Sequence, residues 1–148
     1  MLLVRTELKA SRIHGYGLFA AERIAAGRVI WRFTPGLDAA VPLESIASQP
    51  SIIRDFINRY CSLDPPRNRF VVYMDDTRFI NHSFQPNVWL DQEHDILVAS
   101  RDIEAGEEIT EDYSETEWDG LEITSNFSEG KRENSTQRYL RAGQPRAR

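Results

Sequence analysis

The spacing of apolar residues changes along the chain and predicts mainly short β-strands. Residues 2–8 alternate between apolar and polar positions, and Val29–Phe33 is a run rich in β-branched and aromatic residues. Both patterns are typical of strands. A further short strand is expected after Gly17, and others are expected at residues 70–74, 87–90, 95–99 and 109–112. Turn-forming residues separate these runs, so the sequence favours a fold of several small sheets.

One helical insert interrupts this pattern between residues 42 and 66. Pro42 in a first helical turn predicts a short helix that reaches Ala47. Ser51 is the expected N-cap of a longer helix that ends at residues 64–66. One apolar stripe is predicted along that longer helix, and it consists of Ile52, Ile53, Phe56, Ile57 and Tyr60.

The segment from Arg78 to Asn87 is polar although it lies between two apolar runs. Its sequence is Arg-Phe-Ile-Asn-His-Ser-Phe-Gln-Pro-Asn. A buried polar group costs about 1–3 kcal/mol unless it is hydrogen-bonded, so packing alone does not explain this segment. The cluster either supports a difficult crossing of the chain or contacts a polar ligand, and the residues alone leave both interpretations open.

Charge is distributed unevenly along the chain. Residues 131–148 contain six Lys or Arg and one Glu, a net charge of +5, and because the whole chain carries −5, residues 1–130 carry −10. Residues 102–122 contain ten acidic residues and no Lys or Arg. That segment is either a solvated acidic face or a surface that attracts a basic polypeptide. The basic tail lacks interleaved aromatic residues, so no direct nucleic-acid binding is expected.

Length and residue usage exclude several classes of protein. A chain of 148 residues is sufficient for one domain with its own core. Arg5 follows the N-terminus too closely for a signal peptide, and no apolar run has the length of a membrane span, so we expect a cytoplasmic protein without a membrane partner. Cys61 is the only cysteine, which excludes an internal disulfide and a cysteine-based zinc site. No metal is expected.

Two more segments contain candidate functional residues. Gly15 and Gly17 flank Tyr16 just before an apolar strand. Glycines in such positions let a ligand approach the backbone closely, although a simple turn would explain them equally well. Tyr113 ends a strand inside the acidic segment, where an ordinary packed aromatic residue would also fit.

Together, in this order and at these separations, the three segments resemble the SET domain of protein-lysine methyltransferases. The resemblance extends from about Ser11 to Tyr113. Residues 78–87 contain the family pattern Arg-Phe-x-Asn-His-Ser-x-x-Pro-Asn in full, and residues 106–113 contain Gly-Glu-Glu-(Leu/Ile)-Thr-x-Asp-Tyr. Residues 13–19 are similar to the first motif of the family, which is not specific by itself.

The resemblance implies a mainly β fold with short helices, β-clip-like, built of small sheets and closed by a C-terminal pseudoknot. The strand ending near Tyr113 would cross the segment that contains Asn81 and His82. A SET domain would occupy residues 1–123, followed by a basic, loosely ordered tail at residues 124–148.

The resemblance also implies S-adenosyl-L-methionine as the cofactor and the side-chain amine of a protein lysine as the methyl acceptor. Tyr113 is the expected catalytic residue, at the meeting point of cofactor and lysine. The expected cofactor-binding residues are Gly15, Tyr16, Gly17, Arg78, Asn81, His82, Tyr113 and Trp118. The partner would be a basic, lysine-containing protein or peptide, and self-association into a homodimer is left open.

Two residues of the expected substrate channel depart from the family pattern. Phe33 stands where a tyrosine is usual, which removes one hydroxyl from the channel, and Glu111 stands where an aromatic residue is often found. A carboxylate facing the channel would favour lysine binding and oppose its deprotonation. These departures keep an alternative open, namely a SET-fold binding module that has lost efficient catalysis. A third alternative, methylation of a small amine, agrees less well with the acidic segment.

Overall fold

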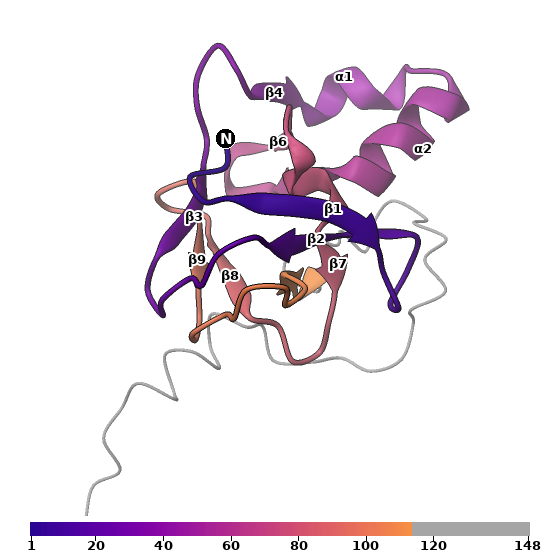
Figure 1. Ribbon diagram of the computed structural model, residues 1–148. Coiled ribbons are helices and arrows are strands. Elements are labelled where there is room, and N and C mark those ends of the chain that lie inside the picture. Colours follow the sequence, from indigo (N-terminus) through magenta and orange to yellow (C-terminus); the bar gives the residue numbers. More distant parts are fainter. Residues whose placement is uncertain (114–148) are drawn as a thin grey trace, which may run out of the picture.

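The computed structural model describes residues 1–113, and the regular elements in this range are short (Figure 1). The helices are α1 (Leu43–Ala47) and α2 (Ser51–Tyr60), with 3-10 turns η1 (Pro65–Arg67) and η2 (Asp76–Phe79). The strands are β1 (Thr6–Ala10), β2 (Tyr16–Ala20), β3 (Val29–Arg32), β4 (Ala39–Pro42), β5 (Cys61–Asp64), β6 (Arg69–Val72), β7 (Asn81–His82), β8 (Val88–Asp91), β9 (Ile96–Ala99) and β10 (Thr110–Glu111). The mainly β fold of small sheets expected from the sequence is therefore confirmed.

The strands of the described region form small sheets with different strand orders. β1 and β2 form an antiparallel hairpin, and the orders β3-β9-β8 and β4-β6-β5 describe two antiparallel sheets of three strands. β7 and β10 pair in parallel, with Thr110 opposite Asn81 and Glu111 opposite His82. This parallel pair joins the polar decapeptide to the last acidic strand, although the two lie about thirty residues apart in the sequence.

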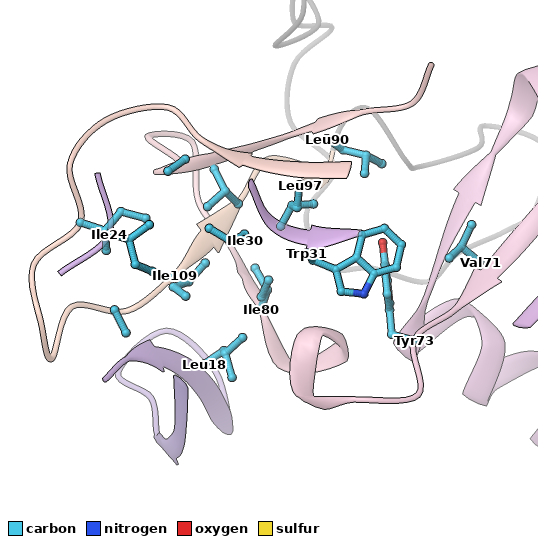
Figure 2. Close-up of a cluster of buried hydrophobic side chains, with 14 residues drawn as sticks. Leu18, Ile24, Ile30, Trp31, Val71, Tyr73, Ile80, Leu90, Leu97 and Ile109 are labelled. Atoms are coloured by element: carbon cyan, nitrogen blue, oxygen red, sulfur yellow. The ribbon is translucent and has the colours of Figure 1, made fainter. Parts of the chain in front are cut away.

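The main core lies between the β1–β2 hairpin and the β3-β9-β8 sheet. Leu18, Ile30 and Leu97 are completely buried in it, and Ile80 from the polar decapeptide projects into the same cluster (Figure 2). The rings of Trp31 and Tyr73 meet edge to face with their centres 4.9 Å apart. Burial of a large apolar side chain stabilises a fold by about 1.5–3 kcal/mol, so this cluster anchors the backbone on both sides of the decapeptide.

A smaller core holds the helical insert against the β4-β6-β5 sheet. It contains Ile46, Ile57, Leu63 and Phe70. Of the apolar stripe predicted on α2, Ile57 is buried, whereas the exposed fractions of Ile52, Ile53 and Phe56 are 74%, 42% and 46%. The stripe exists, but within the described residues it is only partly covered.

Several predicted boundaries are wrong. The first strand begins at Thr6, because Leu2 makes only an isolated bridge with Trp31. The longer helix has Pro50 rather than Ser51 at its N-cap. It ends at Tyr60, and residues 61–64, which were expected to be helical, pair with β6 instead. β-Branched and aromatic residues of β6 offer that segment a strand partner, which outweighs its local helical preference.

A partly buried ion-pair network connects the β4-β6-β5 sheet to the turn before β9. The carboxylate of Asp64 accepts from Arg69 Nε at 2.7 Å and from Arg67 Nη1 at 3.0 Å. Asp95 accepts from Arg69 Nη2 at 2.9 Å, and the Arg69 guanidinium lies 5.3 Å from the centre of the Phe33 ring.

Within residues 1–113, no helix has the length and apolarity needed to cross a membrane.

Candidate functional site

The candidate site is built around the loop between β7 and β8, which the β10 segment contacts at both ends. At the first end, Ser83 N donates to the carbonyl of Glu111 at 2.9 Å. At the other end, Asn87 N donates to the carbonyl of Thr110 at 3.1 Å, and Asn87 Oδ1 accepts from Thr110 N at 2.8 Å. Asn87 also donates through Nδ2 to the Glu108 carbonyl at 2.8 Å. These bonds satisfy the buried backbone of the crossing.

The side chain of Asn81 binds the turn between β1 and β2. Its Nδ2 atom donates to the carbonyls of His14 and Tyr16 at 3.2 and 3.1 Å, and to Glu108 Oε1 at 2.8 Å. Asn81 is 8% exposed, so these contacts replace water as the partners of a buried amide. Asn81 therefore joins the glycine-containing turn to both motifs that follow it.

His82 holds the backbone of Tyr113. Its Nδ1 atom accepts from Tyr113 N at 3.1 Å, and the two rings lie 5.4 Å apart between centres. Because Nδ1 accepts, the proton of a neutral imidazole lies on Nε2. The ring of Phe84 packs edge to face on His82 at 4.5 Å. These contacts orient the imidazole.

The Tyr113 hydroxyl points back into the fold and donates to the carbonyl of Ile80. Burial, and secondarily the nearby Glu111 carboxylate, raise the pKa of Tyr113 far above its ordinary value. The phenol is consequently neutral at physiological pH. A neutral, oriented phenol can position a reacting group but is a poor general base.

Glu111 is a buried carboxylate whose charge acts on two tyrosines. It is 6% exposed, and its charge contributes to raising the pKa of both Tyr73 and Tyr113, for which burial is the larger cause. The Tyr73 hydroxyl donates to Ser62 Oγ at 2.7 Å. Tyr73 is a buried core residue, and it also belongs to the polar surroundings of Glu111.

Beside this cluster, α2 and η2 enclose a hollow of about 290 Å³ that is open to solvent. It is lined by Phe56, Tyr60, Arg78 and Phe79. The ring centres of Phe56 and Tyr60 are 5.2 Å apart, and the Arg78 guanidinium lies 5.3 Å from the centre of the Phe79 ring. Aromatic faces with one guanidinium suit a ligand that combines a flat ring or a cation with a carboxylate.

The structure brings most of the predicted cofactor-binding residues together. Gly15 and Tyr16 are exposed on the turn that Asn81 binds, whereas Gly17 is buried behind it. Arg78 lines the hollow next to the β7 segment. Trp118 lies outside the described residues, as does the predicted basic tail at 124–148.

Phe33, the other predicted channel residue, is partly buried. It packs against the main core and under the guanidinium of Arg69. By contrast, several residues that the sequence interpretation did not assign to the site contribute to it: Glu108 binds Asn81, and Phe56, Tyr60 and Phe79 line the hollow. The apolar stripe predicted on α2 already contained Phe56 and Tyr60, and the acidic motif contained Glu108.

Among residues 1–113, no group of three or more His, Cys, Asp or Glu side chains could hold a metal ion.

A domain-family model and two known proteins match the sequence. The SET domain model matches residues 15–114. A Plasmodium falciparum protein named for histone-lysine N-methyltransferase activity is 32% identical over 121 residues, which is 74% of this chain but 2% of that protein. A SET domain-containing protein of Phaeosphaeria nodorum is 50% identical over 52 residues, 31% of this chain and 8% of that protein. The chain thus spans a small fraction of both relatives.

Solved structures show the same fold. Neurospora DIM-5, a histone lysine methyltransferase, matches with a TM-score of 0.56 and 22% identity over 88% of this chain and 56% of its own. A structure of ctPRC2, the Chaetomium thermophilum complex, bound to S-adenosylmethionine matches with a TM-score of 0.58 and 25% identity over 76% of this chain and 15% of its own. The model match covers most of the chain and agrees with the meeting of the three motifs at Asn81 and Tyr113. The chain belongs to the SET domain family.

Proposed function

We propose that this protein is a protein-lysine N-methyltransferase that uses S-adenosyl-L-methionine. The observation that carries the proposal is the convergence of Asn81, His82 and Tyr113 with the turn at Gly15 and Tyr16, next to a hollow lined by Arg78. Membership in the SET domain family supports the reaction class, and a related structure contains the same cofactor. The chain's own residues have to bind the cofactor, orient the lysine and exclude water from the site.

The residues present fit this cofactor. Bound in the site, it would supply a methyl group attached to a positively charged sulfur. The Arg78 guanidinium offers a partner for an amino-acid carboxylate, and Tyr60 and Phe79 offer aromatic surfaces for a flat base or a cation. Asn81, three residues after Arg78, binds the exposed turn at Gly15 and Tyr16. Trp118 is a further candidate for covering the cofactor.

Tyr113 is the proposed catalytic residue and acts by orientation. Transfer to an amine is an in-line displacement, so alignment of the amine supplies much of the acceleration. The amine must be neutral although a free lysine has a pKa of about 10.4, and an apolar channel beside a positive charge lowers that value. A neutral phenol held by Ile80 can accept from the amine without presenting the charge that would keep the lysine protonated.

Glu111 gives this site a property that favours a second candidate function. A buried carboxylate close to Tyr113 attracts the lysine ammonium and simultaneously opposes its deprotonation. Strong binding with slow transfer would describe a SET-fold binding module for basic, lysine-containing peptides. The negative charge of residues 1–130 suits a basic protein substrate or partner in both cases.

The proposal is tested by measuring cofactor binding and methyl transfer with the full chain. Titration calorimetry with S-adenosyl-L-methionine should detect binding that Arg78→Ala weakens by about tenfold or more, which corresponds to one charge-assisted contact. Arg23→Ala is the matched control, because Arg23 is exposed and pairs with Asp102 away from the hollow. Mass spectrometry of histones and cell lysate incubated with isotopically labelled cofactor should then reveal methylated lysines. Cofactor binding without any transfer would favour the binding module, and the absence of cofactor binding would refute the methyltransferase.

A further inference from the structure

The carboxylate of Glu108 connects the three motifs that form the proposed cofactor site. Ser11 Oγ donates to both of its oxygens, at 2.8 Å to Oε1 and 2.9 Å to Oε2. Asn81 Nδ2 donates to Oε1 at 2.8 Å. Ser11 Oγ itself accepts from Ile13 N at 2.8 Å, so the carboxylate fixes the start of the turn between β1 and β2 as well as the decapeptide.

Glu108 occupies the space that a side chain at position 17 would need. A Cβ atom built on Gly17 would lie 2.2 Å from Glu108 Oε1, 2.8 Å from its Cδ and 3.1 Å from Asn81 Nδ2. Contacts below 3.0 Å are not tolerated by real Cβ atoms unless the neighbour moves. Glu108 has little freedom to move because Ser11 and Asn81 hold it.

Backbone conformation does not explain the glycine at position 17. Gly15, with φ of +49°, adopts the left-handed region that favours glycine, whereas Gly17 lies in β2 and is not among the residues with positive φ. Gly17 is also buried, unlike Gly15 and Tyr16, so it is not a surface that a ligand can approach freely. The steric contact with Glu108 is therefore the remaining explanation for the glycine at position 17.

We propose that Glu108 is a positioning residue of the cofactor site, and that position 17 is glycine because the Glu108 carboxylate fills the place of its Cβ. Glu108 holds the Asn81 amide in the position from which it binds the carbonyls of His14 and Tyr16. The first motif thus has two glycines with different roles. The part of this inference that concerns cofactor affinity rests on the proposed function.

A double-mutant cycle tests the steric part without any cofactor. Gly17→Ala should lower the Tm by about 5–10 °C in the wild-type background, since a displaced buried carboxylate costs one to two hydrogen bonds. In the Glu108→Ala background the same change should lower the Tm by less than about 3 °C, because the space is then free. Equal losses in both backgrounds would overturn the steric relationship.

A second measurement tests the positioning role. Glu108→Gln keeps the shape but turns an amide toward the donors Ser11 and Asn81, so cofactor Kd and KM should rise by about five- to tenfold while kcat at saturating cofactor changes less than about twofold. Glu104→Gln, an exposed neighbour that pairs with Arg23, is the control. Unchanged cofactor affinity in Glu108→Gln, with a wild type that binds, would overturn this inference alone. A wild type that binds no cofactor would overturn the proposed function and the positioning role. The steric relationship would then be decided by the double-mutant cycle of Tm values alone.

Discussion

The imidazole of His82 accepts the backbone N–H of Tyr113 at 3.1 Å. This bond ties the end of the acidic motif to the centre of the polar decapeptide, and it runs beside the parallel pairing of β7 and β10. The backbone of the proposed catalytic tyrosine therefore depends on a side chain that lies 31 residues earlier.

Two replacements of His82 should distinguish the effect of losing the Nδ1 acceptor from the effect of losing the imidazole ring. His82→Ala leaves a half-buried N–H without its partner and should lower the free energy of unfolding by about 1–3 kcal/mol, together with the rate of methyl transfer. His82→Asn places an amide oxygen near the position of Nδ1 and should retain part of both. Urea unfolding and a peptide methylation assay measure the two effects. Identical behaviour of the two variants would show that the acceptor is unimportant.

Tyr113→Phe should slow methyl transfer by about tenfold or more, because the lysine amine is then less well aligned with the methyl group. Cofactor affinity should change by less than about twofold, since the hydroxyl is bound to the Ile80 carbonyl rather than directed at the hollow. Arg23→Ala is the control, because Arg23 is exposed and pairs with Asp102. Steady-state kinetics and calorimetry check both statements, and an unchanged kcat in Tyr113→Phe would remove this residue from the mechanism.

Glu111→Gln should lower the pKa of both Tyr73 and Tyr113. Their pKa values are raised first by burial and second by the Glu111 charge, so the values in the variant should stay above the ordinary tyrosine pKa. Tyrosinate absorbance during an alkaline titration, with circular dichroism to confirm folding, measures the shift. An unchanged titration in the variant would place Glu111 away from the two phenols.

The same shift predicts how stability responds to alkaline pH. In the folded protein these phenols keep their protons to higher pH than in the unfolded chain, so their stabilising contribution is complete below the ordinary tyrosine pKa of about 10 and is lost as pH rises above it. Glu111→Gln lowers the folded-state pKa, and the decline above about pH 10 should become shallower.

Asp64→Asn should destabilise the protein strongly. Asp64 is 4% exposed and binds two guanidinium groups, so removing its charge leaves Arg69 partly buried without full compensation, at a cost of about 3 kcal/mol. Glu7→Gln breaks the exposed pair with Lys9 and should cost less than about 0.5 kcal/mol. Urea unfolding at neutral pH compares the two. Similar small losses would mean that the Asp64 network contributes little net stability.

Cys61 should react slowly with alkylating reagents in the folded protein. Burial raises the pKa of its thiol from 9.0 to about 11, although the charge of Arg78 opposes the shift. At pH 8 the thiolate fraction, and with it the alkylation rate, should be about a hundredfold lower than for an ordinary thiol. Mass spectrometry of timed iodoacetamide reactions, with and without urea, tests this prediction. Fast modification of the folded chain would contradict it.

Local sequence determined several of the strands and the candidate functional residues that lie close together in the chain. The strand at Val29 and the strands on either side of the decapeptide were predictable because β-branched and aromatic residues alternate or cluster there. The polar residues from Asn81 to Asn87 were predictable as functional or supporting, because burying them without partners is costly. β4, β5 and β7 escaped prediction, since each depends on a partner strand elsewhere in the chain.

The tertiary structure alone decided which of these residues meet. Sequence placed Gly17, Asn81 and Glu108 in three separate motifs, and only the fold places the Glu108 carboxylate where a Cβ on Gly17 would be. It also decided that Ile53 and Phe56 stay exposed while Ile57 is buried, and that Phe33 packs under Arg69. Local propensity records the preferences of neighbouring residues, whereas hydrogen bonds and steric contacts between distant segments arise only when the whole chain is packed.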